Sequence, residues 1–174
     1  MFADRGLRGS GLEEIINITN EVYLKNGLAI IQKIPTPITP IEIDKETRHI
    51  TLAYFDKKST VDYIGAVQGI PICFDAKETA NKSLPLQNIH PHQIEFMEKF
   101  MQQEGVSFLL VHFLEFDEYY FLPFEVLKKY VDAAAEGGRK SIPYSAFEKK
   151  YQIKNEKGYI CHYLEALNVY ITGK

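Results

Sequence analysis

The stretch VSFLLVHF, residues 106–113, constrains the fold more than any other segment of this chain because it is an almost unbroken apolar run. A strand with one face in water alternates apolar and polar residues, whereas a strand covered on both faces reads as a continuous apolar run. The run therefore predicts a central strand of a sheet that has helices packed on both sides.

The elements around this strand predict the rest of the sheet and its helices. Apolar residues from Leu12 to Tyr23 recur at helical spacing, with Ser10 as a cap and Gly27 at the end. Further helices are predicted over residues 90–104 and 124–136, and further strands over residues 28–34 and 119–123. The predicted fold class is α/β, with a mixed β-sheet flanked by helices in one domain of 174 residues.

Residues 35–60 are expected to leave this domain as an inserted, projecting stalk. Prolines at positions 35, 37 and 40 favour an extended, poorly paired segment. Residues 41–55 then alternate apolar and polar side chains around a polar centre at 44–49, which is typical of a hairpin. Residues 1–10 are expected to form a flexible N-terminal arm.

The stretch VDYIGAVQGIPICFDAKET, residues 61–79, predicts a second hairpin that carries charges at its open end. Gln68 and Gly69 suit a two-residue loop, because glycine supplies the positive φ that such turns need. With that loop, Asp62 lies directly across from Asp75. Side chains alternate along a strand, so Lys77 falls on the same face as Asp75. Two carboxylates and one ammonium therefore converge.

Carboxylates that face each other destabilise a sheet unless another group offsets their charge. Mg²⁺ or Mn²⁺ would do so, since such cations prefer oxygen ligands and often combine two carboxylates with water and phosphate. Lys77 would then orient a water or steady charge on phosphorus, as in a metal-dependent phosphodiesterase. The first helix offers Glu13 and Glu14 as a third acid. The alternative is that Asp75 and Lys77 form an exposed ion pair without catalytic meaning.

Composition excludes several other classes of protein. Cys73 and Cys161 form no disulfide framework, and Cys73 lies in an apolar run, as expected for a buried residue in a reducing cytoplasm. No segment has the length of a membrane span, and residues 1–10 lack the apolar region of a signal peptide. The net charge of −3 by itself argues against a nucleic-acid-binding protein.

At these motifs the chain resembles a known family. Asp62-Tyr63 followed by Phe74-Asp75-Ala76-Lys77-Glu78-Thr79 resembles the PD-(D/E)xK nuclease pattern, and more narrowly the RecU-type Holliday junction resolvases. The likeness runs from about Arg8 to the C-terminal region. Further segments carry it: NITN at 17–20, PTPI at 35–38, PLQN at 85–88, HQIE at 92–95 and GGRKSIP at 137–143.

The resemblance implies a restriction-endonuclease-like core and a homodimer that nicks opposed strands of a four-way DNA junction with Mg²⁺ or Mn²⁺. It implies the catalytic residues Asp62, Asp75 and Lys77, with Glu13 as the helix-borne acid and Gln93 as a supporting polar residue. Asp62 and Asp75 would be the metal ligands. Recombinase and branch-migration proteins are the protein partners that such an activity implies.

The DNA-binding residues would come from basic clusters despite the negative net charge. Arg8 lies in the N-terminal arm, Lys57 and Lys58 at the base of the stalk, and Arg139 and Lys140 after two glycines. Those glycines can expose backbone N–H groups to a phosphate. Phe55 is expected either to stack on an unpaired base at the junction centre or to pack in the core.

Two departures from the family pattern keep other functions open. Asp75 stands where the family has Glu, and Val61 stands where it has Thr. The first alternative is therefore a catalytically weak junction-binding protein with an architectural role in recombination. A generic exonuclease is the second alternative, although a proline-rich stalk suits a junction better than a DNA end.

The remaining candidate residues have simpler interpretations. His90 and His92 flank a proline at a helix start, where a metal-ligand pair is disfavoured, and His112 is expected to be a hydrogen-bonded core residue. Lys128-Lys129 and Lys149-Lys150 are expected on solvated helix faces.

Overall fold

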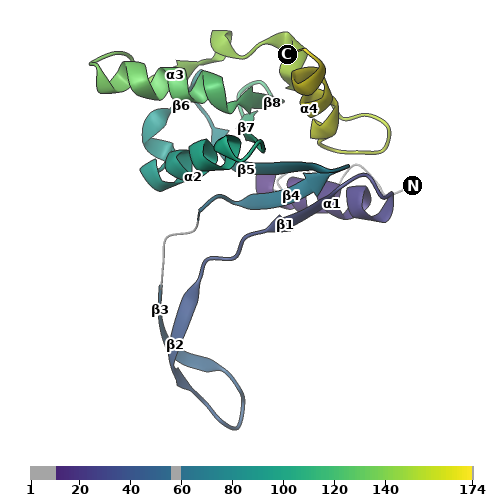
Figure 1. Ribbon diagram of the computed structural model, residues 1–174. Coiled ribbons are helices and arrows are strands. Elements are labelled where there is room, and N and C mark those ends of the chain that lie inside the picture. Colours follow the sequence, from purple (N-terminus) through teal and green to yellow (C-terminus); the bar gives the residue numbers. More distant parts are fainter. Residues whose placement is uncertain (1–10, 56–59, 174) are drawn as a thin grey trace.

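The computed structural model describes residues 11–55 and 60–173, and its centre is a six-stranded mixed sheet (Figure 1). The strand order is β1-β4-β5-β7-β8-β10, with β5 and β7 parallel and the other neighbours antiparallel. The strands are β1 (Ile30–Lys33), β4 (Tyr63–Val67), β5 (Ile70–Thr79), β7 (Val106–Phe113), β8 (Glu118–Pro123) and β10 (Gln152–Ile153). The predicted strand at 106–113 is confirmed, and it lies inside the sheet.

Within the described residues, four helices cover the two faces of this sheet: α1 (Leu12–Lys25), α2 (Pro91–Gln102), α3 (Phe124–Ala135) and α4 (Tyr163–Thr172). Alternate residues of β5 point to opposite layers. Phe74 packs with residues of α1 and α4, whereas Cys73 packs with residues of α2 and α3. The predicted α/β class, with a mixed sheet flanked by helices, is confirmed. No helix in the described part of the chain is long and apolar enough to cross a lipid bilayer.

The residue before helix α1 is Gly11, which has no side chain to cap the helix. The predicted cap Ser10 lies outside the described residues. Glu78 at the end of β5 accepts a hydrogen bond from the N–H of Leu12 (3.1 Å), so a distant carboxylate satisfies one of the open donors. Gly27, with φ of 67°, follows the helix at its predicted end.

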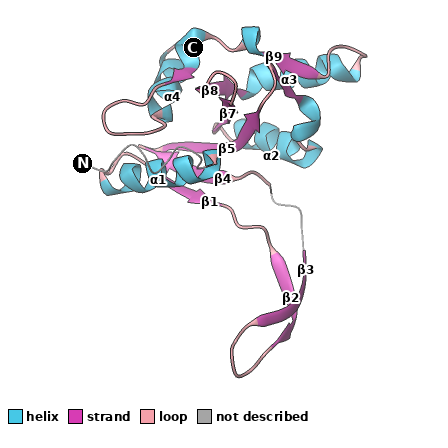
Figure 2. Ribbon diagram, turned by 180° about the vertical axis from the view of Figure 1, so that it is seen from behind, coloured by secondary structure: helices cyan, strands magenta, loops and turns pink. Residues whose placement is uncertain are grey.

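A two-stranded hairpin of β2 (Ile38–Ile43) and β3 (Ile50–Phe55) projects from the body (Figures 1 and 2). Asp44 closes its tip by accepting hydrogen bonds from the backbone N–H groups of Glu46 (2.9 Å) and Thr47 (2.8 Å). The expectation that residues 35–40 form a poorly paired segment is wrong for residues 38–40, which pair with residues 53–55 of β3. Proline is tolerated because the hairpin has open edges, and the register shifts directly after Pro40.

Several C-terminal elements were not predicted. A small sheet joins β6 (Ser83–Pro85) to β9 (Ser141–Pro143), and helix α4 ends the chain. Lys149 and Lys150 lie in a short 3₁₀ turn, not on the predicted helix face. Lys128 does lie on helix α3, where it pairs with Asp132 (2.6 Å).

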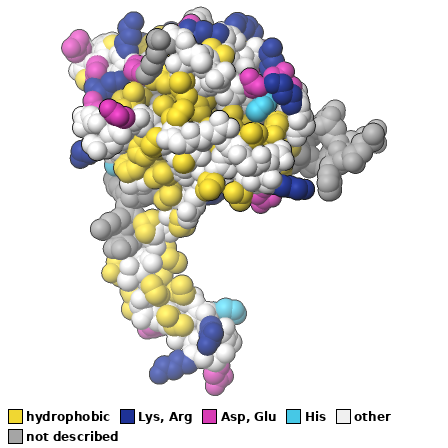
Figure 3. Space-filling view, turned by 45° about the vertical axis from the view of Figure 1, so that its right-hand side comes forward, with side chains coloured by type: hydrophobic (Ala, Val, Ile, Leu, Met, Phe, Trp, Pro, Cys, Tyr) yellow, Lys and Arg dark blue, Asp and Glu magenta, His cyan; other side chains and the backbone are white. Residues whose placement is uncertain are grey.

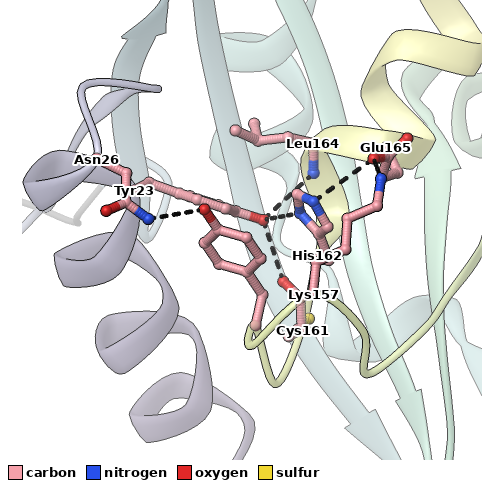
Figure 4. A network of polar contacts seen from close by, with 8 residues as sticks. Tyr23, Asn26, Lys157, Cys161, His162, Leu164 and Glu165 are labelled. Carbon is pink, nitrogen blue, oxygen red and sulfur yellow. Dashed lines mark hydrogen bonds and ion pairs between the residues drawn. The ribbon is translucent and has the colours of Figure 1, made fainter.

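A buried polar network ties helix α1 to the segment that precedes α4 (Figure 4). The hydroxyl of Tyr23 lies 2.9 Å from Nδ1 of His162 and 3.4 Å from the carbonyl oxygen of Cys161. Asn26 donates a hydrogen bond to the hydroxyl of Tyr159 (2.9 Å). Burial raises the pKa of the Cys161 thiol to about 12, so this cysteine is structural rather than reactive.

Candidate functional site

The hairpin of β4 and β5 has the predicted two-residue turn. Gln68 and Gly69 both have positive φ angles, 48° and 90°, as a tight hairpin turn requires. Val67 pairs with Ile70, and the ladder continues to Tyr63 opposite Phe74. The predicted register is therefore confirmed, and one further step places Asp62 across from Asp75.

Asp62 and Asp75 contact each other through backbone and carboxylate groups. The N–H of Asp62 donates to Oδ1 of Asp75 (3.1 Å), and Oδ2 of Asp62 accepts from the N–H of Ala76 (2.9 Å). Asp75 is fully buried, whereas Asp62 is half-buried. One of the two facing acids, Asp75, therefore lies in the interior, and the other, Asp62, is partly open to solvent.

Gln93 in the first turn of α2 orients the buried carboxylate. Its Nε2 donates to Oδ1 of Asp75 (2.8 Å), while its Oε1 accepts from the N–H of His90 (2.9 Å). The second contact fixes which end of the amide faces Asp75. Oδ1 of Asp75 thus accepts hydrogen bonds from two donors, the N–H of Asp62 and Nε2 of Gln93. The contact with Asp75 is consistent with the predicted supporting role of Gln93.

The other oxygen of Asp75, Oδ2, is buried, and its partner is the ammonium of Lys77, which forms an ion pair with it from the same face of the strand. Buried charged oxygens normally have partners. A buried carboxylate beside a second one, that of Asp62, also suits a hard divalent cation, so these residues fit a Mg²⁺ or Mn²⁺ ion.

The pKa of Asp75 also agrees with a cation site at Asp62 and Asp75. Burial and then the nearby Asp62 carboxylate raise the pKa of Asp75 to about 7, while Lys77 acts in the opposite direction. Burial also raises the pKa of Tyr63, with smaller contributions from Glu13, Asp62 and Asp75. Negative charge therefore accumulates around this end of the hairpin.

Glu13 lies near these acids but is not brought into contact with them. It forms an ion pair with Lys33 and lines a depression of about 460 Å³ with Ala76 and Glu78. Ala76 and Glu78 alternate with Asp75 and Lys77, so they face α1 while Asp75 and Lys77 face α2. No group of three metal-binding side chains forms within residues 11–55 and 60–173. The role of Glu13 stays a prediction.

Glu78 makes structural contacts that the sequence did not reveal. Besides capping α1, its Oε1 lies 3.3 Å from Nδ1 of His112, whose Nε2 lies 3.1 Å from Asp117. His112 is 7% exposed and is the hydrogen-bonded core histidine that was predicted. Strand alternation indicated that Glu78 faces the side opposite Lys77. It could not identify Leu12 and His112 as the partners of Glu78, because both are distant in sequence.

Only some of the predicted DNA-binding residues lie within the part of the chain that the structure describes. Arg139 and Lys140 are exposed directly before β9, after a helix end at which Gly137 has φ of 91°. Phe55 is 76% exposed, so its interpretation as a core residue is wrong. Arg8, Lys57 and Lys58 lie outside the described residues.

Comparison with known proteins gives one consistent family. A family model for recombination protein U matches residues 7–169. The Holliday junction resolvase RecU of Oenococcus oeni is 46% identical over 149 residues, which is 83% of this chain and 76% of that protein. The resolvase RecU of Limosilactobacillus reuteri is 43% identical over 172 residues, covering 96% and 84%. That of Streptococcus pneumoniae is 40% identical and covers 99% and 87%.

Among solved structures, that of Hjc, a Holliday junction resolvase from Archaeoglobus fulgidus, gives a TM-score of 0.47 at 9% sequence identity. It covers 78% of this chain and 90% of that chain. The family match and the relatives above span nearly the whole sequence, and on that basis the chain belongs to the recombination protein U (RecU) family.

Proposed function

We propose that this chain is a structure-selective endonuclease that resolves four-way (Holliday) DNA junctions in homologous recombination and repair. The relatives that match most of its length carry the name of that activity. The observation that carries the proposal is the facing pair of Asp62 and Asp75, with Lys77 ion-paired to the buried Oδ2 of Asp75.

Asp62 and Asp75 would hold Mg²⁺ or Mn²⁺ at this site. When bound, the cation supplies Lewis-acid charge that offsets the negative charge of phosphodiester hydrolysis. Gln93 and the N–H of Asp62 hold the Asp75 carboxylate in one orientation. Lys77 is placed to donate a hydrogen bond to a water or to a phosphate oxygen.

The DNA would contact the projecting hairpin and the basic residues around the body. Arg139 and Lys140 directly precede β9, beside the far end of β6, where Ser141 pairs with Pro85 and the carbonyl oxygen of Lys140 accepts from the N–H of Leu86. Arg8, Lys57 and Lys58 complete the proposed phosphate contacts, and Phe55 is exposed for stacking on an unpaired base.

Homodimerisation is the second part of the proposal, because two strands must be cut and each chain carries one site. Apolar side chains support it: Figure 3 shows them along the hairpin and on the adjacent face of the body. Those that are exposed include Ile30 on edge strand β1 and Ile38, Ile41, Ile43, Ile50, Leu52 and Tyr54 on the hairpin. A surface with this many exposed apolar side chains marks an interface.

The expected result is a mass of twice 20.0 kDa in light scattering at micromolar concentration. Replacing Leu52 by Ser should shift the equilibrium toward the monomer, because a polar side chain then enters the apolar surface. A matched change at exposed Thr51 to Ser should leave the mass unchanged. A monodisperse monomer for the unaltered chain would contradict the dimer.

The junction test uses one labelled four-way junction beside a linear duplex of the same sequence. Nicking of the junction in Mg²⁺ or Mn²⁺, with little nicking of the duplex and none in EDTA, is the expected result. Junction binding without nicking in either metal would instead favour the architectural role. Equal nicking of both substrates would contradict structure selectivity.

A further inference from the structure

The turn between β7 and β8 carries two exposed apolar side chains close to the catalytic strand. Leu114 is 50% exposed and Phe116 is 37% exposed. The N–H of Leu114 donates to the carbonyl oxygen of Thr79 (2.9 Å), two residues beyond Lys77 on β5. At about 3.3 Å per residue, the attachment point lies about 7 Å from Lys77 along the strand, or about two base steps of DNA.

The ring of Phe116 is held by other aromatic side chains. Its centroid lies 4.5 Å from that of Tyr144 and 6.5 Å from that of Phe113. Tyr144 also meets Phe113 edge-on, at 5.2 Å and 89°. One side of the Phe116 ring is therefore packed, and the exposed remainder is a flat surface in a defined orientation.

Hydrogen bonds fix the position of the Tyr144 ring on which Phe116 packs. The hydroxyls of Tyr144 and Tyr120 both donate to Oε2 of Glu118, at the start of β8. The hydrogen bond from Tyr144 is the main cause that lowers the pKa of Glu118, so the carboxylate stays ionised and keeps accepting both donors. Phe116 thus packs on a ring whose own position is fixed. Binding of a ligand to the exposed part of Phe116 would therefore cost little conformational entropy, because the side chain is already ordered.

The charges around the turn distinguish between possible ligands. Glu115 pairs with Lys82 (3.2 Å), and Asp117 lies 3.1 Å from Nε2 of His112. Two carboxylates beside the ring disfavour a phosphate group at this point. A neutral aromatic ligand stacks there without that repulsion, and the 72% exposed side chain of Lys82 can reach a phosphate beyond the patch.

We propose that Phe116, with Leu114 beside it and Lys82 at its edge, is a stacking site for an unpaired nucleobase of the DNA strand that is cut. The base would lie within about three nucleotides of the cleaved bond, because the turn that carries Phe116 is attached to β5 two residues beyond Lys77. This inference rests on the proposed nuclease function and adds a position at which the enzyme recognises a distorted strand. Stacking of this kind tolerates every base because each has a π-face.

The test is photocrosslinking to four-way junctions that carry one 5-iodouracil each, at successive positions around the cleavage point. Complexes of the full chain are formed in EDTA, so that the strand stays uncut, and are irradiated at long wavelength. The expected result is a crosslink to Phe116, identified by mass spectrometry, from bases within about three nucleotides of the cleaved bond. Phe116→Leu keeps the apolar bulk without the π-face, and Phe116→Tyr keeps the π-face.

Phe116→Leu should lose that crosslink and bind the junction about five- to hundredfold more weakly, whereas Phe116→Tyr should retain both properties. Thermal melting of the variants checks that each is folded. If the unaltered chain nicks junctions but crosslinks elsewhere, or if folded Phe116→Leu binds normally, the stacking site is wrong and the nuclease function stands. If the unaltered chain neither binds nor nicks a junction, the proposed function itself fails.

Discussion

Asp75→Asn is expected to lower the rate of junction nicking by at least about a hundredfold while leaving junction affinity nearly unchanged. The substitution keeps the volume of the side chain, and the asparagine oxygen can still accept from Gln93 and from the N–H of Asp62. The group that changes is at the position of Oδ2, where an amide nitrogen replaces the anionic oxygen that faces Lys77. A cation loses one of its two proposed carboxylate ligands there.

Binding should survive because the proposed phosphate contacts come from basic residues such as Arg139 and Lys140. The measurement is a gel-shift titration and a nicking assay on the same labelled junction, in Mg²⁺ and in Mn²⁺. Asp132→Asn is the matched control, since Asp132 lies on α3, pairs with Lys128 and should affect neither readout. Unchanged nicking by Asp75→Asn would remove Asp75 from the mechanism.

Thermal unfolding gives a readout of the metal that does not depend on cleavage. A cation at a hundred times its dissociation constant stabilises a folded protein by about 2.7 kcal/mol if it does not bind the unfolded chain. The melting temperature of the unaltered chain should therefore rise with Mn²⁺, and that rise should be smaller in Asp75→Asn. Equal rises in both proteins would place the cation elsewhere.

The sequence predicts the features that short-range rules determine. The turn at Gln68-Gly69 fixes the register of its hairpin, and the register fixes which residues face each other. Asp62, Asp75 and Lys77 could therefore be placed together without a structure. The strand at 106–113 was equally accessible, because burial on both faces leaves a continuous apolar run.

The parts that the sequence could not predict depend on contacts between distant segments. The short strands 83–85 and 141–143 carry too few residues for a periodic signal, and each exists because the other pairs with it. Gln93 was suggested only by family resemblance, and its contact with Asp75 depends on how α2 packs on the sheet. Glu13 was placed on the correct helix, but periodicity did not show that Lys33 would pair with it.

Phe74→Ala is expected to lower the free energy of unfolding by about 3–5 kcal/mol, a large part of the 5–15 kcal/mol typical of a domain. Phe74 directly precedes Asp75 but faces the opposite layer, where it is fully buried. Its ring stacks between those of Tyr63 and Phe108, each at 4.8 Å, and also contacts Tyr163 at 5.3 Å. Three rings would therefore lose a partner and surround a cavity.

Urea denaturation followed by circular dichroism measures this loss, with Phe55→Ala as the control. Phe55 is 76% exposed at the end of β3, so its truncation should change stability by no more than about 0.5 kcal/mol. Because the stack joins β4, β5 and β7, its loss loosens the strands that hold Asp62 and Asp75 in register. Folded Phe74→Ala protein should therefore also nick junctions more slowly. Equal stability of the two variants would show that the stacked rings do not anchor the hairpin that carries Asp62 and Asp75.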